Sequence, residues 1–177
     1  MAKHLLILGL ATSLILLVPM VAMRFSTEVR WTGLDFIAAG LLLFGAGLAY
    51  LFLAGRNGNA AYRVAAGLAV ASTLFLIWVN LAVGLIGSED NPANLMYFGV
   101  ISVGLVAAAT ARFRPEGMAR ALFAMAIAQA LIAVVALIGG WGQPASGPVE
   151  ILGVNGLFIA LFVASAFLFR RSARQSV

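Results

Sequence analysis

Hydrophobic residues fill six long stretches of the chain, and charged or turn-forming residues separate them. A transmembrane helix needs roughly 20 predominantly apolar residues, and each stretch comes close to or exceeds that length. The pattern therefore predicts an all-α integral membrane protein, a six-helix transmembrane bundle that forms a single domain over residues 1–177. The predicted helices span about 5–23, 34–55, 64–87, 92–111, 118–140 and 149–169.

Composition agrees with a membrane protein. Of the 177 residues 63% are hydrophobic and 10% are charged, and the mean hydropathy is +1.07. Soluble domains carry about 25% charged residues, so a soluble fold is excluded. The first hydrophobic stretch, Leu5 to Met23, exceeds the roughly 7–15 apolar residues of a signal peptide, and no small-residue cleavage site follows it. We therefore predict that it is a transmembrane helix, which Pro19 kinks or ends.

Charged residues are distributed unequally between the two sides that alternating helices define. One side receives nine basic residues and the other side only two. The nine are Lys3, Arg56, Arg63, Arg112, Arg114, Arg120, Arg170, Arg171 and Arg174, and the two are Arg24 and Arg30. Five acidic residues belong to the basic-poor side: Glu28, Asp35, Glu89, Asp90 and Glu150. Since basic residues mark cytoplasmic loops, both termini are predicted to be cytoplasmic.

The pI near 10.8 raises the question of nucleic acid as a partner. The arginines are dispersed over short loops and a tail, so they do not form the single basic face that nucleic acid requires. We interpret them as topology determinants and as anchors for anionic lipid headgroups. The predicted partners are the lipid bilayer and either further copies of the chain or a larger membrane complex.

Small residues follow one face of several predicted helices. Because transmembrane helices associate by close packing of small residues, these faces are expected to point inward. They comprise Gly40 and Gly47 in helix 34–55, Gln129, Ala133, Ala136 and Gly140 in helix 118–140, and Gly153, Gly156, Ala160 and Ala164 in helix 149–169. The large residues Phe158, Phe162 and Phe169 are expected to face lipid or a neighbouring copy.

The connection after helix 64–87 is rich in oxygen-bearing side chains. Ser88, Glu89, Asp90, Asn91 and Asn94 lie within seven positions. Three interpretations remain open. Asp90 or Asn91 caps the next helix, with Pro92 in its first turn; the segment recognises a solute; or its oxygens bind a hard cation, although the spacing is not that of an EF-hand.

Two amide side chains, Asn80 and Asn155, lie at similar depth below the same side of the predicted bundle. A polar group in hydrocarbon is costly unless it finds a partner or water. We consider an outward-facing polar vestibule lined by Asn80, Ser88, Glu89, Asp90, Asn91, Asn94, Tyr97 and Asn155. The alternative is that Asn80 and Asn155 form hydrogen bonds between helices.

Catalytic patterns are missing from the sequence. The only histidine is His4 and there is no cysteine, so the residues of a haem, zinc or serine–histidine site are lacking within the bundle. No ionisable residue lies near the middle of a predicted helix, whereas proton-coupled pumps keep such residues there. We therefore predict that the protein is not an enzyme and holds no cofactor or metal.

A resemblance to known proteins rests on two segments. Trp78–Tyr97 contains the motif Asn-Leu-Ala-Val-Gly-x-Ile-Gly-Ser-Glu-Asp-Asn-Pro-Ala-Asn-Leu-Met-Tyr, and Ala111–Leu122 follows it. Here the chain resembles a group of small, uncharacterised multipass inner-membrane proteins of bacteria. The likeness covers roughly Trp31 to Ile138. It implies a bacterial inner membrane, with a cytoplasmic basic side and periplasmic acidic loops, and it carries no activity.

Two classes of function remain open on the sequence. The first is a structural or accessory membrane protein that self-associates or stabilises a complex through its small-residue faces. The second is a module that binds or conducts a small polar or cationic solute from the periplasmic side. The acidic outer connection favours the second class, and the lack of intramembrane ionisable residues favours the first.

Overall fold

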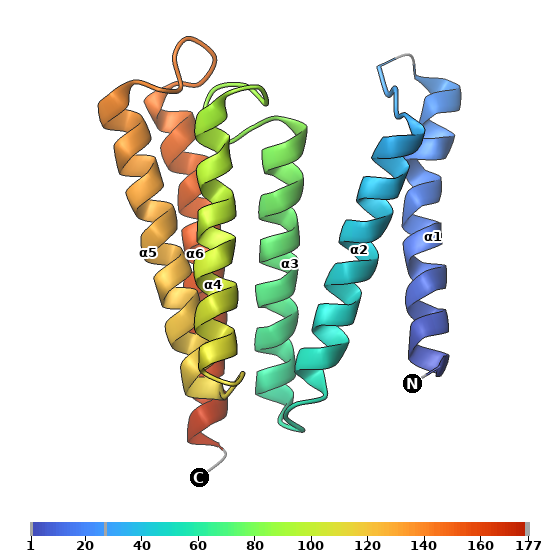
Figure 1. Ribbon diagram of the computed structural model, residues 1–177, viewed down its shortest axis with the longest axis vertical. Coiled ribbons are helices and arrows are strands. Elements are labelled where there is room, and N and C mark those ends of the chain that lie inside the picture. The colour runs from blue at the N-terminus through green and yellow to red at the C-terminus, as the bar shows by residue number, and fades with distance from the viewer. Residues whose placement is uncertain (1, 27, 176–177) are drawn as a thin grey trace. The chain divides into compact units, whose positions relative to one another are not determined.

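The computed structural model describes residues 2–26 and 28–175, and within these residues it contains helices and no strand. Six of the helical segments are long and apolar enough to cross a membrane, which indicates a multipass membrane protein. The elements are α1 (Ala2–Phe25), α2 (Gly33–Ala54), α3 (Ala60–Ala82), the short 3₁₀ helix η1 (Pro92–Leu95), α4 (Met96–Thr110), α5 (Pro115–Gly139) and α6 (Pro148–Arg174) (Figure 1).

The chain divides into two compact units, Met1–Leu51 and Phe52–Val177. The first unit holds α1 and most of α2. Gly40 and Gly47 of α2, which were expected to point inward, face α1: a side chain at Gly47 would clash with Leu8, and one at Gly40 would lie 3.5 Å from the side chain of Leu16. Within the described part of this unit only Thr12 and Ala39 are buried.

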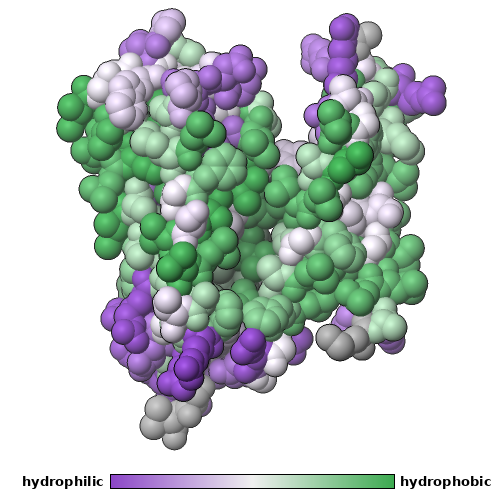
Figure 2. Space-filling model, viewed as in Figure 1, coloured by the Kyte–Doolittle hydropathy of each residue, from purple (hydrophilic) through white to green (hydrophobic). Residues whose placement is uncertain are grey.

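The second unit holds the four helices α3 to α6. Helix α6 packs along both α5 and α3, and α4 packs along α5 (Figure 1). Hydrophobic residues cover the middle of this unit, and hydrophilic residues gather at its two ends (Figure 2). Such a band is expected of a surface that meets lipid tails between two layers of headgroups.

The inward face of α6 differs from the prediction. Phe158, Phe162 and Phe169 are fully buried, whereas Gly153 and Gly156 are exposed. Buried small residues lie instead on the helices that α6 contacts, α3 with Ala65, Ala66 and Ala69, and α5 with Ala126, Ala133 and Ala136. Large side chains of α6 thus belong to the same core cluster as small side chains of its neighbours.

Several helix ends also differ from the predicted ones. The helix expected to reach residue 87 ends at Ala82, because the following backbone turns at Gly84, where φ is +73°. Helix α5 begins earlier than predicted, at Pro115, since proline suits the first helical position. Helix α6 continues to Arg174 instead of ending near Phe169.

Pro19 lies inside α1 and does not end it, because the helix continues to Phe25.

Candidate functional site

The connection between α3 and η1 is organised by a single side chain, Asn94. Its Oδ1 accepts hydrogen bonds from the backbone amides of Leu85 and Ile86, both at 2.9 Å. Its Nδ2 donates to the carbonyl oxygens of Ile86 (3.3 Å) and Ser88 (2.7 Å). Asn94 is 5% exposed. Its amide therefore supplies hydrogen-bond partners to backbone groups of the connection that are buried away from water.

Asn91 performs two tasks in the same connection. Its Oδ1 accepts from the backbone amide of Ala93 at 3.0 Å and so caps η1, with Pro92 in the first turn. Of the two cap residues considered on the sequence, Asn91 is therefore the cap. Its Nδ2 donates to the carbonyl oxygen of Trp141, at 2.8 Å, in the connection between α5 and α6.

A second hydrogen bond joins the same two connections. The hydroxyl of Ser146 donates to the carbonyl oxygen of Gly87 at 3.2 Å. Gly87 has a φ of +71°, a conformation that glycine adopts without strain. The two connections at this end of the four-helix unit are thus tied together by Asn91 and Ser146.

Ser88, Glu89 and Asp90 lie on the outside of this connection. All three are exposed. Within residues 2–26 and 28–175, no group of three or more histidine, cysteine, aspartate and glutamate side chains is arranged to hold a metal ion. The structure therefore separates these three residues from the buried members of the predicted vestibule.

The buried polar cluster centres on Asn155 of α6. Its Oδ1 accepts hydrogen bonds from the hydroxyl of Tyr97 in α4 and from Nε2 of Gln129 in α5, both at 2.9 Å. Its Nδ2 donates to the carbonyl oxygen of Ile151 at 2.8 Å, one turn earlier in α6. Tyr97 and Gln129 are fully buried and Asn155 is 1% exposed. Three helices are therefore joined through one amide oxygen.

Asn80 of α3 binds a different partner. Its Nδ2 donates to the carbonyl oxygen of Asn94 at 3.1 Å, and its side chain is 6% exposed. Asn80 therefore binds the 3₁₀ helix η1, which precedes α4, and does not bind Asn155. Two buried amide oxygens, Asn80 Oδ1 and Gln129 Oε1, have no hydrogen-bond donor among the described residues.

Gln129 is the member of this cluster that the set of eight vestibule residues did not include. It was assigned on the sequence to an inward-facing stripe of α5, and it is buried there. An amide inside a membrane-spanning helix was the available signal, because such a group needs a partner. Its bond to Asn155 depends on how α5 and α6 are rotated, which the spacing within one helix does not determine.

Comparison of the chain with protein-family models, with curated proteins and with solved structures gave no match.

Proposed function

We propose that the protein is a structural or accessory multipass membrane protein, which self-associates or stabilises a larger membrane complex. The observation that carries this proposal is the pair of hydrogen bonds that Tyr97 of α4 and Gln129 of α5 donate to Asn155 of α6. Interhelical hydrogen bonds of this kind hold membrane helices together. A conduction path needs polar groups that face a solute, whereas these groups face their neighbours.

The charged residues support the same class. In the six candidate spans the described charged residues lie close to the helix ends, as Asp35 and Arg63 do. Coupling of transport to protons or ions generally uses an acidic or basic group within the membrane. The spans of this protein lack such a group in their middle sections.

The orientation that we propose for the protein in the membrane follows from the charged residues at the two ends of the four-helix unit. Eight arginines lie at the end where α3 begins and α6 ends, and three acidic residues, Glu89, Asp90 and Glu150, lie at the other end. By the positive-inside rule the arginine end is cytoplasmic, and an even number of spans then places both termini there. The resemblance of Trp78–Tyr97 to bacterial proteins points to the inner membrane.

A second candidate function, binding or conduction of a small polar or cationic solute, is favoured by one observation. Asn80 Oδ1 and Gln129 Oε1 are buried acceptors without a donor among the described residues. A solute with N–H or O–H groups, or a small cation, would satisfy them. Under this alternative the solute enters past the exposed Glu89 and Asp90.

Cysteine labelling separates these two functions, and the chain has no cysteine of its own. Asn80→Cys and Asn155→Cys are exposed separately to a membrane-impermeant thiol reagent added outside, with the exposed position Glu89→Cys as the labelled control. The proposed scaffold predicts labelling at Glu89→Cys alone. Rapid labelling of both buried positions would favour the solute path and overturn the scaffold.

Association is tested by the mass of the intact protein in mild detergent. A structural or accessory role predicts particles whose protein mass exceeds the 18.5 kDa of one chain, either as a multiple of it or with a second protein in fixed ratio. A uniform population of single chains across a range of protein concentrations would contradict the proposal.

A further inference from the structure

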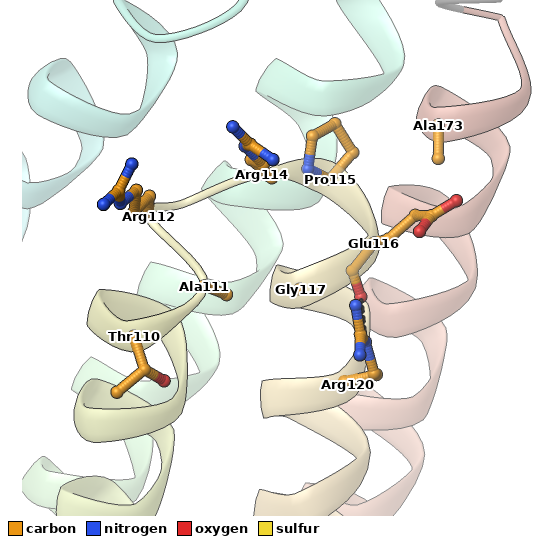
Figure 3. A pocket seen from close by; sticks show the side chains of 9 residues that line it. All are labelled: Thr110, Ala111, Arg112, Arg114, Pro115, Glu116, Gly117, Arg120 and Ala173. Atoms are coloured by element: carbon orange, nitrogen blue, oxygen red, sulfur yellow. Dashed lines mark hydrogen bonds between the residues drawn. The ribbon is translucent and has the colours of Figure 1, made fainter.

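An open pocket of about 810 Å³ lies at the arginine-rich end of the four-helix unit, where α4 passes into α5. Three arginines, Arg112, Arg114 and Arg120, and one acid, Glu116, line it together with Ala173 of α6. In Figure 3, Arg112 and Arg114 extend from the turn beyond the helix ends, whereas Arg120 lies along α5 and Glu116 reaches toward Ala173. The pocket therefore carries an excess of positive charge.

The turn that bears two of these arginines has an unusual backbone. Helix α4 ends with hydrogen bonds from the amide of Arg112 to Ala109 O (2.9 Å) and from the amide of Phe113 to Ala108 O (3.0 Å). This helix stop requires a left-handed residue, usually glycine. Arg112 and Phe113 adopt φ values of +52° and +58°. An arginine thus occupies a position where glycine would be less strained.

Helix α5 ends with the same pattern of hydrogen bonds and provides the comparison. The amide of Trp141 donates to Ala136 O at 3.0 Å, and the amide of Gly140 donates to Leu137 O at 3.3 Å. Here the left-handed position is a glycine, Gly140, with a φ of +64°. The chain therefore uses glycine at one such stop and arginine at the stop beside the pocket.

Contacts on Phe113 hold the strained turn in place. The hydroxyl of Tyr62 donates to the carbonyl oxygen of Phe113 at 2.8 Å, and the rings of Phe113 and Phe52 meet edge to face with centroids 5.1 Å apart. The guanidinium of Arg56 lies 4.4 Å from the ring centre of Phe52 and 5.4 Å from that of Phe113. These contacts fix the backbone from which Arg112 and Arg114 project.

Within the described part of the chain, the arginines of the pocket have no carboxylate partner. None of its three arginines forms an ion pair with a carboxylate of the described residues, and Arg120 Nε reaches only the backbone oxygen of Glu116, at 3.5 Å. Arg114 is the cap residue of α5 and makes no side-chain hydrogen bond to its first turn. The positive end of α5 therefore adds to the potential of the arginines.

We propose that this pocket binds a phosphate group, that of an anionic phospholipid headgroup. Guanidinium groups bind phosphate through paired N–H donors, and three arginines line this space. The pocket opens at the end of an apolar band, where the headgroups of a bilayer lie. Glu116 is the acceptor for a hydroxyl next to the phosphate, which a phosphoglycerol headgroup supplies. A soluble phosphate ester has the same chemistry and is distinguished by experiment.

The test uses the full chain in mild detergent and measures lipid binding by native mass spectrometry. The probes are phosphatidylglycerol, phosphatidylcholine and soluble glycerol phosphate. Arg112→Gly is the decisive variant, because glycine suits its backbone and its thermal stability without lipid is expected to be equal or higher. Arg114→Gln and Arg120→Gln remove the other charges. Arg63→Gln is the matched control, since Arg63 is exposed at the same end but does not line the pocket.

We expect phosphatidylglycerol to bind in preference to phosphatidylcholine, and each pocket variant to weaken that binding by about tenfold or more, the loss of a hydrogen-bonded charge. Arg63→Gln should change it by less than about twofold. Equal weakening by Arg63→Gln and the pocket variants would reduce the effect to general charge attraction and overturn the proposal, as would full binding by Arg112→Gly. If glycerol phosphate binds as well as the lipid and depends on the same arginines, the phosphate site stands and its source is soluble.

Discussion

Removal of Asn155 tests the strength of the buried polar cluster. Asn155→Ala deletes the oxygen that accepts from Tyr97 and from Gln129, and it leaves both donors inside the four-helix unit. The bond to Ile151 lies within α6 and holds no second helix. Two interhelical bonds are therefore lost. Tyr97→Phe is the complementary change, because it removes one hydroxyl and preserves the ring.

The magnitude follows from the number of bonds. Interhelical hydrogen bonds in membrane proteins contribute about 0.6 kcal/mol on average and up to about 1.7 kcal/mol. Tyr97→Phe should therefore lower the free energy of unfolding by about 0.6 kcal/mol, and Asn155→Ala by about 1.2–3.4 kcal/mol for two such bonds. The double variant should lose less than the sum of the two single changes, by a coupling energy of about 0.6 kcal/mol.

The assay is reversible unfolding in mixed micelles, which gives the free energy of unfolding. It is applied to the unchanged protein, the two single variants and the double variant. Ser102→Ala is the matched control in the same helix as Tyr97, because the exposed hydroxyl of Ser102 bonds only to Phe98 O one turn earlier. It should leave stability unchanged. Strict additivity of Asn155→Ala and Tyr97→Phe would refute the reasoning, since it would mean that the two side chains do not interact.

Three further predictions concern the connections and the topology. Asn94→Ala leaves two buried loop amides without an acceptor and should cost about 2 kcal/mol or more, with faster hydrogen exchange of those amides; unchanged exchange would contradict it. Gly84→Ala places a Cβ 2.5 Å from a backbone oxygen at a left-handed position and should cost about 2 kcal/mol or more, whereas Gly99→Ala, which meets open space in α4, should be neutral or slightly stabilising; equal effects would argue against the described turn. A reporter active only in the cytoplasm should work at the C-terminus and near Asn57 and fail near Asn91; activity near Asn91 would overturn the alternating arrangement of spans.

The existence of the helices could be predicted from the sequence, but some of their ends could not. Apolar length alone indicates six spans, because lipid leaves the backbone few alternatives to a helix. The end of α3 at Ala82 depends on Asn94, whose side chain binds the amides of Leu85 and Ile86. That bond joins positions eight and nine residues apart, and no helical periodicity reveals it.

The face of α6 was predicted incorrectly for a related reason. The rule that small residues lie between membrane helices does not state which helix of a pair supplies them. In this protein α3 and α5 supply alanines, and α6 supplies Phe158 and Phe162. The rotation of α6 then follows from a stripe of large residues, which the sequence alone favoured as a surface that faces lipid.

The candidate sites could be predicted from the sequence to different degrees. Asn80 and Asn155 stood out on the sequence because amides are costly in lipid, and both are buried and hydrogen-bonded. Their partners depend on helix rotation. The arginine pocket was not predicted. The turn that carries Arg112 has a left-handed backbone at Arg112 and Phe113, and the sequence has no glycine at these positions that would indicate such a turn.

One hydrogen bond between α3 and α6 can form only after α6 has been synthesised. Ser165 of α6 donates to the carbonyl oxygen of Ala65 in α3, 100 residues earlier in the chain. At a synthesis rate of about 5–20 residues per second, Ser165 is synthesised roughly 5–20 s after Ala65. During that interval the face of α3 that packs against α6 meets lipid instead.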